Sequence, residues 1–191
     1  MIFVTVGAQM PFDRMIRAVD DWAGSRGRYD VFAQIGDTDY RPRNIRYSQF
    51  LDPSSFRDRV EQADAIIAHA GMGSILTALE FGKPILVFPR RGDLKETRND
   101  HQVDTARQLL KQGRVNVAMD EFELMERMDL IQSLHTQEPL GQFASPRLIH
   151  ALRGFIEAST EPVPAVVPSF DSVYDEGDGA TLAISQGTVR G

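Results

Sequence analysis

The chain has 191 residues, of which 42% are hydrophobic and 25% are charged, a composition typical of a globular protein with a core of its own. It contains no cysteine, which excludes disulfides, thiolate metal sites and cysteine nucleophiles. The net charge of −6 argues against nucleic acid as a partner, and residues 159–191 carry −4 of it, from five acids and one arginine.

Short runs of β-branched and apolar residues alternate with amphipathic segments over residues 1–158. The runs fall at residues 2–6, 30–35, 45–48, 65–69, 85–88 and 115–118. Helical patterns fall at residues 12–24, 53–62, 73–82, 100–112, 121–134 and 145–157. This alternation predicts an α/β fold, a parallel sheet of about six strands with helices on both faces.

The two ends of the chain carry different signals. The first six residues lack a basic flank and a cleavage pattern, and no apolar run approaches the ~18 residues of a membrane span, so the start is interpreted as a strand. Residues 159–191 contain Pro162, Pro164 and Pro168, then several glycines, with no helical period. We therefore expect a domain at 1–158 and an acidic, mostly disordered tail at 159–191.

Polar or glycine-containing segments follow four of the predicted strands, at residues 7–9, 36–37, 70–74 and 89–92. Ligands of parallel α/β sheets bind beyond the carboxyl ends of the strands, at one edge of the sheet. These segments are therefore expected to converge on a single site.

The segment His-Ala-Gly-Met-Gly-Ser at residues 69–74 has two interpretations. Gly71 and Gly73 permit a sharp turn and the close approach of a ligand, and Ser74 is suited to cap the helix that follows. The free N–H groups at that helix N-terminus would then hold a phosphate, with His69 as a further donor. The other interpretation is an ordinary turn, because glycines and a serine are common between a strand and a helix. The pattern is neither G-x-G-x-x-G nor G-x-x-x-x-G-K-[ST], which argues against the usual dinucleotide and P-loop sites.

Three segments in chain order resemble the C-terminal, nucleotide-sugar-binding half of glycosyltransferase family 28. They are residues 69–75, Gly82-Lys83-Pro84 and residues 99–102 (Asn-Asp-His-Gln). The opening residues 3–7 and the pair Phe12-Asp13 are similar to the small catalytic subunit of two-subunit transferases of dolichol-linked glycan synthesis. They are equally similar to bacterial counterparts in exopolysaccharide synthesis. The resemblance covers residues 1–157 and implies a Rossmann-like fold, the donor half of a GT-B glycosyltransferase.

The resemblance implies that the chain binds a UDP-sugar while a membrane-anchored partner subunit binds a lipid-linked glycan acceptor. It implies transfer of a hexose with inversion, without cofactor or metal, by a cytoplasmic chain recruited to the cytoplasmic face of the membrane. The four histidines have no paired ligand spacing, in agreement with the expected absence of a metal. The alternatives are a non-catalytic sugar-nucleotide-binding or regulatory subunit, and a UDP-sugar epimerase or hydrolase, which normally carries both halves in one chain.

By the same resemblance, individual residues acquire roles in the donor site. The diphosphate is expected to contact Gly7, Ala8, Gln9, His69, Gly71, Gly73 and Ser74. The donor sugar is expected to contact Asn99, Asp100, His101 and Gln102. His101 and Asp13 are secondary candidates for the catalytic base, which is mainly expected on the partner. Gln9 is alternatively a solvated turn residue, and His101 alternatively starts a helix capped by Asn99 or Asp100.

Three further positions stay open. Many members of the family carry a ribose-binding acid seven residues before the proline of the 82–84 turn, and here that position is Thr77, which offers one hydroxyl. Glu80 either substitutes for that acid or is a solvated helix residue. The basic segment 90–95 either neutralises the diphosphate or is a solvated loop. In the last helix, residues 148, 152 and 155 share an apolar face that either docks the partner or packs on its own domain.

Overall fold

The computed structural model describes residues 1–113, 115–134 and 146–159 of the chain. Its contacts divide the chain into two units, residues 1–144 and 145–191, and each is described by itself. The expected disordered tail lies outside the described residues from position 160 onward, and the domain boundary at residue 158 stays a prediction.

The first unit is built on one parallel sheet, as the alternation of elements predicts. Its strands are β1 (Ile2–Thr5), β2 (Val31–Gln34), β3 (Arg46–Ser48), β4 (Ala65–His69), β5 (Ile85–Phe88) and β6 (Asn116–Val117). All neighbouring strands pair in parallel, in the order β3-β2-β1-β4-β5-β6. This order confirms the expected Rossmann-like sheet of six strands.

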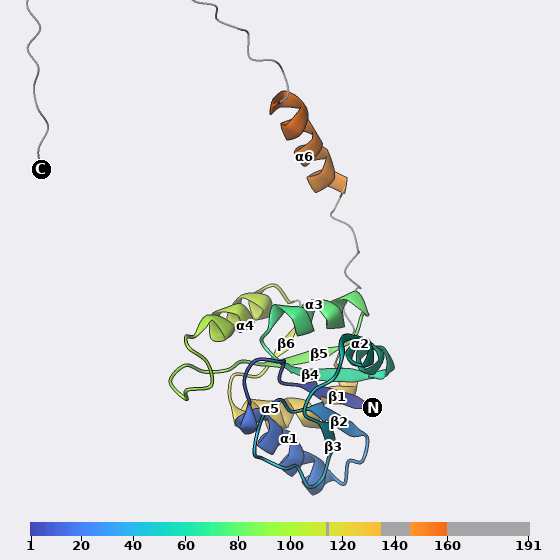
Figure 1. Cartoon of the computed structure of the whole chain (residues 1–191), viewed down its shortest axis with the longest axis vertical. Coiled ribbons are helices and arrows are strands. Elements are labelled where there is room, and N and C mark those ends of the chain that lie inside the picture. Colours follow the sequence, from blue (N-terminus) through green and yellow to red (C-terminus); the bar gives the residue numbers. More distant parts are fainter. Residues whose placement is uncertain (114, 135–145, 160–191) are drawn as a thin grey trace, which may run out of the picture. The chain divides into compact units, whose positions relative to one another are not determined.

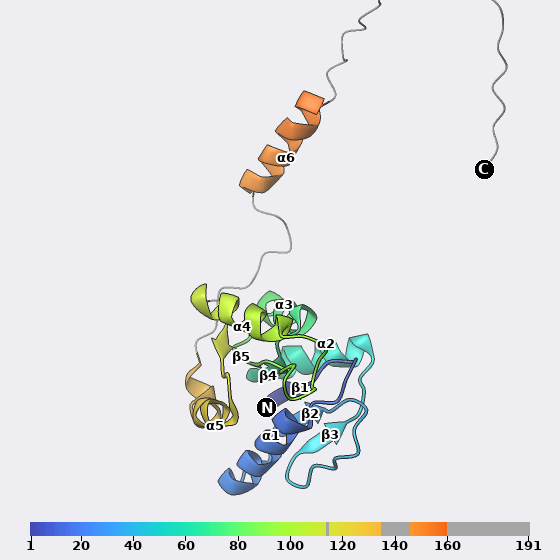
Figure 2. The ribbon, with the colours of Figure 1, turned by 90° about the vertical axis from the view of Figure 1, so that its left-hand side faces the viewer.

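Helices cover both faces of the sheet (Figures 1 and 2). On one face lie α2 (Pro53–Gln62), α3 (Met72–Glu80) and α4 (His101–Lys111), and on the other lie α1 (Asp13–Arg26) and α5 (Glu121–Asp129). The single helix expected over 121–134 is wrong: α5 ends at Asp129, and the 3-10 turn η1 (Ile131–Ser133) follows. The Leu130 N–H bonds the Arg127 carbonyl three residues back, which tightens the last turn.

The second unit contains α6 (Pro146–Ser159). In the described parts of the chain, no helix combines the length and apolar character that crossing a bilayer requires.

Local sequence explains where two of the helices start. Asp52 precedes α2, its carboxylate accepts the N–H groups of Ser54 and Ser55 at 3.0 and 3.1 Å, and Pro53 occupies the first helical position. Asp120 caps α5 in the same way, accepting the Glu123 N–H at 2.9 Å. Each side chain satisfies N–H groups that the helix leaves free, and a proline at the first turn loses no helical hydrogen bond.

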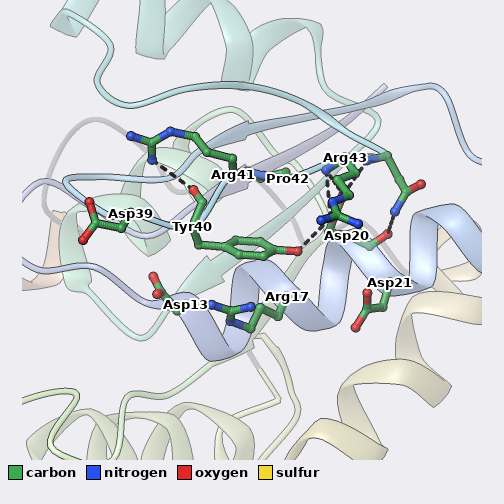
Figure 3. Close-up of a pocket in the computed structure, with 10 residues that line it drawn as sticks. Asp13, Arg17, Asp20, Asp21, Asp39, Tyr40, Arg41, Pro42 and Arg43 are labelled. Carbon is green, nitrogen blue, oxygen red and sulfur yellow. Dashed lines mark hydrogen bonds between the residues drawn. The ribbon is translucent and has the colours of Figure 1, made fainter.

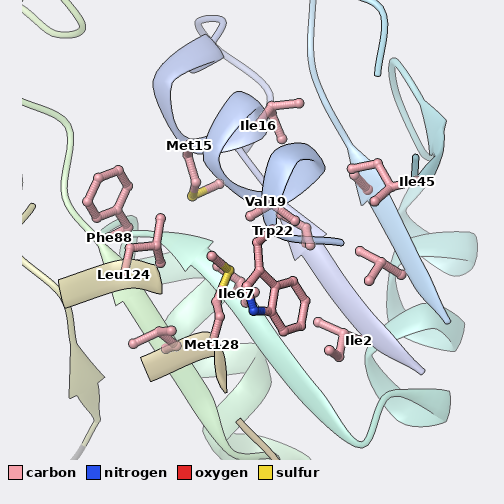
Figure 4. Close-up of a cluster of buried hydrophobic side chains, with 14 of the residues drawn as sticks. Ile2, Met15, Ile16, Val19, Trp22, Ile45, Ile67, Phe88, Leu124 and Met128 are labelled. Carbon is pink, nitrogen blue, oxygen red and sulfur yellow. The ribbon is translucent and has the colours of Figure 1, made fainter. Parts of the chain in front are cut away.

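Two apolar clusters sandwich the sheet. Residues alternate along each strand, so Ile2 and Ile67 face α1 and α5, while Phe3 and Ile66 face the helices of the other side. The first cluster includes Trp22, which is 1% exposed (Figure 4). Its indole N–H donates to the Asp129 carboxylate at 2.8 Å. Burial on both faces explains why strands such as β5 are continuously apolar.

The order of the strands fixes where a ligand has room. The chain crosses from β1 to β2 and β3 on one side, then returns to place β4 on the other side of β1. Adjacent loops leave such a reversal point in opposite directions and open a crevice between them. In this protein the crevice lies beyond the carboxyl ends of β1 and β4, where Thr5 pairs with Ala68.

Candidate donor-binding site

At the crevice, the imidazole of His69 is held between two glycines. His69 ends β4, Gly7 follows β1, and Gly71 precedes α3. A Cβ atom at Gly7 or at Gly71 would lie less than 3.0 Å from the His69 ring, and Gly7 also has a φ of +77°. Both positions therefore require glycine as long as the ring stays where it is. The loops after β1 and β4 meet through this side chain.

The N-terminus of α3 lies next to the same ring. Gly71 is the N-cap residue, and no side chain caps the helix. The expectation that Ser74 caps it is wrong, because Ser74 lies inside the first turn. The helix begins as soon as the chain turns at Gly71, whose N–H bonds the His69 carbonyl at 2.8 Å. The first-turn N–H groups, which have no intrahelical partner, carry the positive end of the helix dipole.

His69 is neutral at physiological pH. Burial disfavours the charged imidazolium, and the nearby guanidinium of Arg90 repels it. Together these effects lower the pKa of His69 to about 4, although the Thr5 main chain acts in the opposite direction. The Nδ1 atom is buried and has no hydrogen-bond partner among the described residues. Because Nδ1 is buried, the ring nitrogen left to hydrogen-bond a ligand is Nε2, which lies beside Gly7 and Gly71.

A cavity of about 100 Å³ lies against the ring. It is lined by Val6, Ala8, Gln9, Met10, His69, Arg90, Thr97, His101 and Gln102. The structure thus brings the expected residues Ala8, Gln9, His69, His101 and Gln102 together. Gln102 is 8% exposed, and its Oε1 accepts the Arg90 N–H at 3.2 Å.

The other residues expected to contact the sugar shape the loop before α4. The Asp100 carboxylate accepts the Gly92 N–H at 2.8 Å and does not cap α4, although Asp100 is its N-cap residue. Asn99 Oδ1 accepts the His101 N–H at 3.4 Å and lies against His101 Nδ1. The side chains of Asn99 and Asp100 therefore both have hydrogen-bond partners within their own loop.

Thr77 and Glu80 lie further along α3. The Thr77 hydroxyl donates to the Gly73 carbonyl at 2.8 Å, which leaves its oxygen as an acceptor only. Glu80 is the last residue of the helix, and its carboxylate pairs with Arg57 of α2 at 3.1 Å. Eight residues at ~1.5 Å each place Glu80 about 12 Å along the axis from the start of α3.

Asp13 lies at the start of α1 and does not line the His69 cavity. Its carboxylate accepts the Thr38 hydroxyl at 2.6 Å. It lines a concavity of about 920 Å³ between α1 and the loop after β2 (Figure 3). Some polar groups of that concavity bond one another: Asp20 accepts the Tyr40 hydroxyl at 2.8 Å, and burial together with this carboxylate raises the pKa of Tyr40 to about 12. We place the site at the smaller cavity, because five of the expected site residues line it.

The fold gives Arg90 a role that no pattern in the sequence indicates. In place of a position in a solvated loop, Arg90 is buried, at 3% exposed. Its guanidinium donates to the carbonyls of Val6 and Met10 at 2.8 and 2.5 Å and to that of Pro11. Burial lowers the pKa of Arg90 to about 10, so it stays charged. Its acceptors lie 79 to 84 residues away in sequence, beyond the reach of any local pattern.

Within the described ranges, no group of three or more histidine, aspartate or glutamate side chains is arranged to hold a metal ion. The polar side chains that line the cavity carry amide, imidazole, guanidinium and hydroxyl groups, and none is a carboxylate. Together with the helix N-terminus, they fit an anion better than a cation.

The family model of the glycosyltransferase family 28 C-terminal domain matches residues 1–136. The chain therefore belongs to this glycosyltransferase family, as the sequence motifs indicated. Among curated proteins, the "UDP-N-acetylglucosamine transferase subunit ALG13" of Mus musculus is 36% identical over 121 residues, which is 58% of this chain. The match spans only 10% of the length of that relative.

Solved structures share the fold. The NMR structure of ALG13 superposes with a TM-score of 0.52 at 18% identity, over 79% of this chain and 94% of that chain. A putative UDP-N-acetylglucosamine 2-epimerase from Listeria monocytogenes gives a TM-score of 0.54 at 16% identity, over 82% of this chain and 45% of that chain. At this identity, the likeness establishes the Rossmann-like half of a GT-B architecture and no more.

Proposed function

We propose that this chain is the donor-binding, catalytic subunit of a glycosyltransferase that moves a hexose from a UDP-sugar to a lipid-linked glycan acceptor. The observation that carries the proposal is the neutral His69 ring, held between Gly7 and Gly71 beside the uncapped N-terminus of α3. This arrangement places the first-turn N–H groups of α3 and the Nε2 atom of His69 at the reversal point of the sheet, where related folds bind nucleotides.

The donor-binding half of the enzyme has to stabilise the departing UDP. Negative charge develops on the diphosphate as the glycosidic bond breaks, and fixed donors aimed at that charge lower the barrier. Each favourable helix-dipole interaction contributes ~0.3–1 kcal/mol at an exposed site. A hydrogen bond from His69 to a charged phosphate oxygen contributes ~1.5–3 kcal/mol. Together these groups supply the role that a metal ion plays in other transferases.

The proposal places acceptor binding and the general base on a membrane-anchored partner subunit at the cytoplasmic face of the membrane. The relative from Mus musculus is itself named a transferase subunit, which supports an incomplete site on this chain. Transfer by direct attack of the acceptor hydroxyl would invert the anomeric carbon, with a base to remove the proton. Of the two secondary candidates, His101 lines the cavity, whereas Asp13 accepts the Thr38 hydroxyl.

The test compares the full chain alone with the chain plus its presumed partner. Calorimetric titration with UDP, GDP and ADP measures donor binding, and incubation with UDP-sugars and a lipid-linked acceptor measures transfer. We expect the chain alone to bind UDP selectively and the pair to form product. Full activity from the isolated chain would refute the split enzyme, and absence of UDP binding would refute the donor role.

Variants separate catalysis from a regulatory role. Ser74→Ala and Gln102→Ala should reduce transfer while the partner still co-purifies, because neither side chain is expected at the partner surface. Arg26→Ala, at the far end of α1, where Arg26 pairs with Asp129 at 2.7 Å, is the control for loss of a polar side chain. A pair that assembles and transfers sugar equally well with all three variants would indicate a non-catalytic subunit.

A further inference from the structure

Arg90 joins the end of β5 to the loop that follows β1. Three of the carbonyls that its guanidinium bonds belong to the segment 6–11, and a fourth is that of Glu96 at 3.4 Å. The segment 6–11 contains Gly7, Ala8 and Gln9, which the family resemblance places against the diphosphate. One buried side chain therefore holds most of the main chain on that side of the cavity.

Aromatic stacking reinforces the same junction. The rings of Phe12 and Phe88 stack with centroids 5.6 Å apart and an interplanar angle of 12°. Arg90 lies 4.6 Å from the Phe12 centroid, and Arg14 lies 4.2 Å from the Phe88 centroid. Arg14 also lies 5.3 Å from the Phe12 centroid, so it contacts both rings while Arg90 contacts Phe12, and these contacts are favourable.

Glu96 connects this stack to the loop before α4. Its carboxylate accepts two hydrogen bonds from Arg14, at 2.6 and 2.8 Å, and one from the Arg91 N–H at 2.9 Å. The main-chain N–H of Arg90 meanwhile bonds Gln102 Oε1. Arg90 therefore touches both walls of the cavity, the segment 6–11 through its side chain and Gln102 through its backbone.

We propose that Arg90 is a positioning residue of the donor site, whose guanidinium holds the segment 6–11 in the conformation that faces the diphosphate. The inference rests on the proposed function for the identity of the ligand, but the hold on the segment is a property of the free protein. A planar guanidinium presents several N–H groups in fixed directions and so serves carbonyls that lie apart. A lysine ammonium keeps the charge but cannot reach the same carbonyls together.

The test uses the full chain with Arg90→Met, Arg90→Lys and a stability control. Ile131→Ala is the control, because Ile131 is 2% exposed and lines a cavity with Ile2 at the opposite edge of the sheet. Calorimetry with UDP gives the dissociation constant. ¹⁵N relaxation of the Ala8, Gln9 and Met10 amides gives the order of the segment on the ps–ns timescale.

We expect Arg90→Met to weaken UDP binding at least tenfold and to lower the order parameters of the three amides. The dissociation constant of Arg90→Lys for UDP should lie within threefold of that of Arg90→Met. Ile131→Ala should match the wild type in both the dissociation constant and the order parameters. If Arg90→Met does not fold, Arg90→Lys carries the same expectation.

Two results would overturn the proposal. One is a segment that stays ordered in Arg90→Met; the other is wild-type affinity in Arg90→Lys, which would make the charge rather than the hydrogen bonds decisive. A wild-type chain that does not bind UDP would refute the proposed function instead. The relaxation data would still decide whether Arg90 holds the segment.

Discussion

Replacing Gly71 by alanine tests the central feature of the site with one methyl group. The backbone of Gly71 has φ −93° and ψ 129°, which alanine adopts without strain. The methyl group, however, would lie less than 3.0 Å from the His69 ring, so the ring must rotate away. Overpacking of this kind costs ~1–3 kcal/mol of unfolding free energy.

The same change should weaken UDP binding. If the displaced ring loses a hydrogen bond to a charged phosphate oxygen, the loss is ~1.5–3 kcal/mol, or about 10- to 150-fold in the dissociation constant. Urea denaturation measures the stability, calorimetry measures the affinity, and the His69 ring resonances report its displacement.

Gly73→Ala is the matched control for stability. A Cβ at Gly73 meets no atom within 4 Å, and the residue lies in the first turn of α3. Alanine is favoured over glycine in helices by up to ~1 kcal/mol, so the free protein should be no less stable than the wild type. Equal stability of Gly71→Ala and Gly73→Ala, with an unmoved ring in both, would refute the account of the site.

Three further predictions follow from contacts of the described residues and from the family. If position 77 faces the ribose, Thr77→Glu should lower the dissociation constant for UDP about tenfold and leave that for 2′-deoxy-UDP unchanged. Glu80→Gln should change the affinity for either nucleotide less than twofold, because Glu80 pairs with Arg57. Since the folded pKa of His69, about 4, lies below its unfolded value, stability is full above pH ~6.5 and falls toward pH 4 by up to about 3 kcal/mol; urea titrations should show a flatter pH dependence in His69→Gln. Deletion of 145–158 should abolish co-purification with the partner and leave the first unit folded, and unfolding of that unit would show instead that α6 belongs to its core.

Most of the sheet was predictable because its strands are buried on both faces. Continuous apolar runs such as Ile85–Phe88 cannot form half-exposed strands, and each run has nearly the bounds of a strand in the structure. Asp52 followed by Pro53 marks the start of α2 for an equally local reason. The approximate position of the site followed from the parallel order, since loops at the carboxyl ends of strands share one edge.

Local patterns could not reveal contacts between distant segments. Arg90 is followed by charged and polar residues, as in a solvated loop, and only the fold shows that the carbonyls of Val6, Met10 and Pro11 surround its guanidinium. Ser74 has the chemistry of a helix cap, but the turn at Gly71 starts the helix three residues earlier. In both cases a tertiary requirement, the position of a loop or of the His69 ring, overrode the local preference.

The burial of Trp22 gives the protein an internal optical probe. Trp22 is the sole tryptophan of the chain, and it lies among the side chains of α1 and α5, with Asp129 on its indole N–H. Its emission should shift to the red when the first unit unfolds, yet a nucleotide at the carboxyl edge would not touch it. Fluorescence melting curves therefore measure ligand affinity through stability alone, since saturation at 100 times the dissociation constant adds ~2.7 kcal/mol.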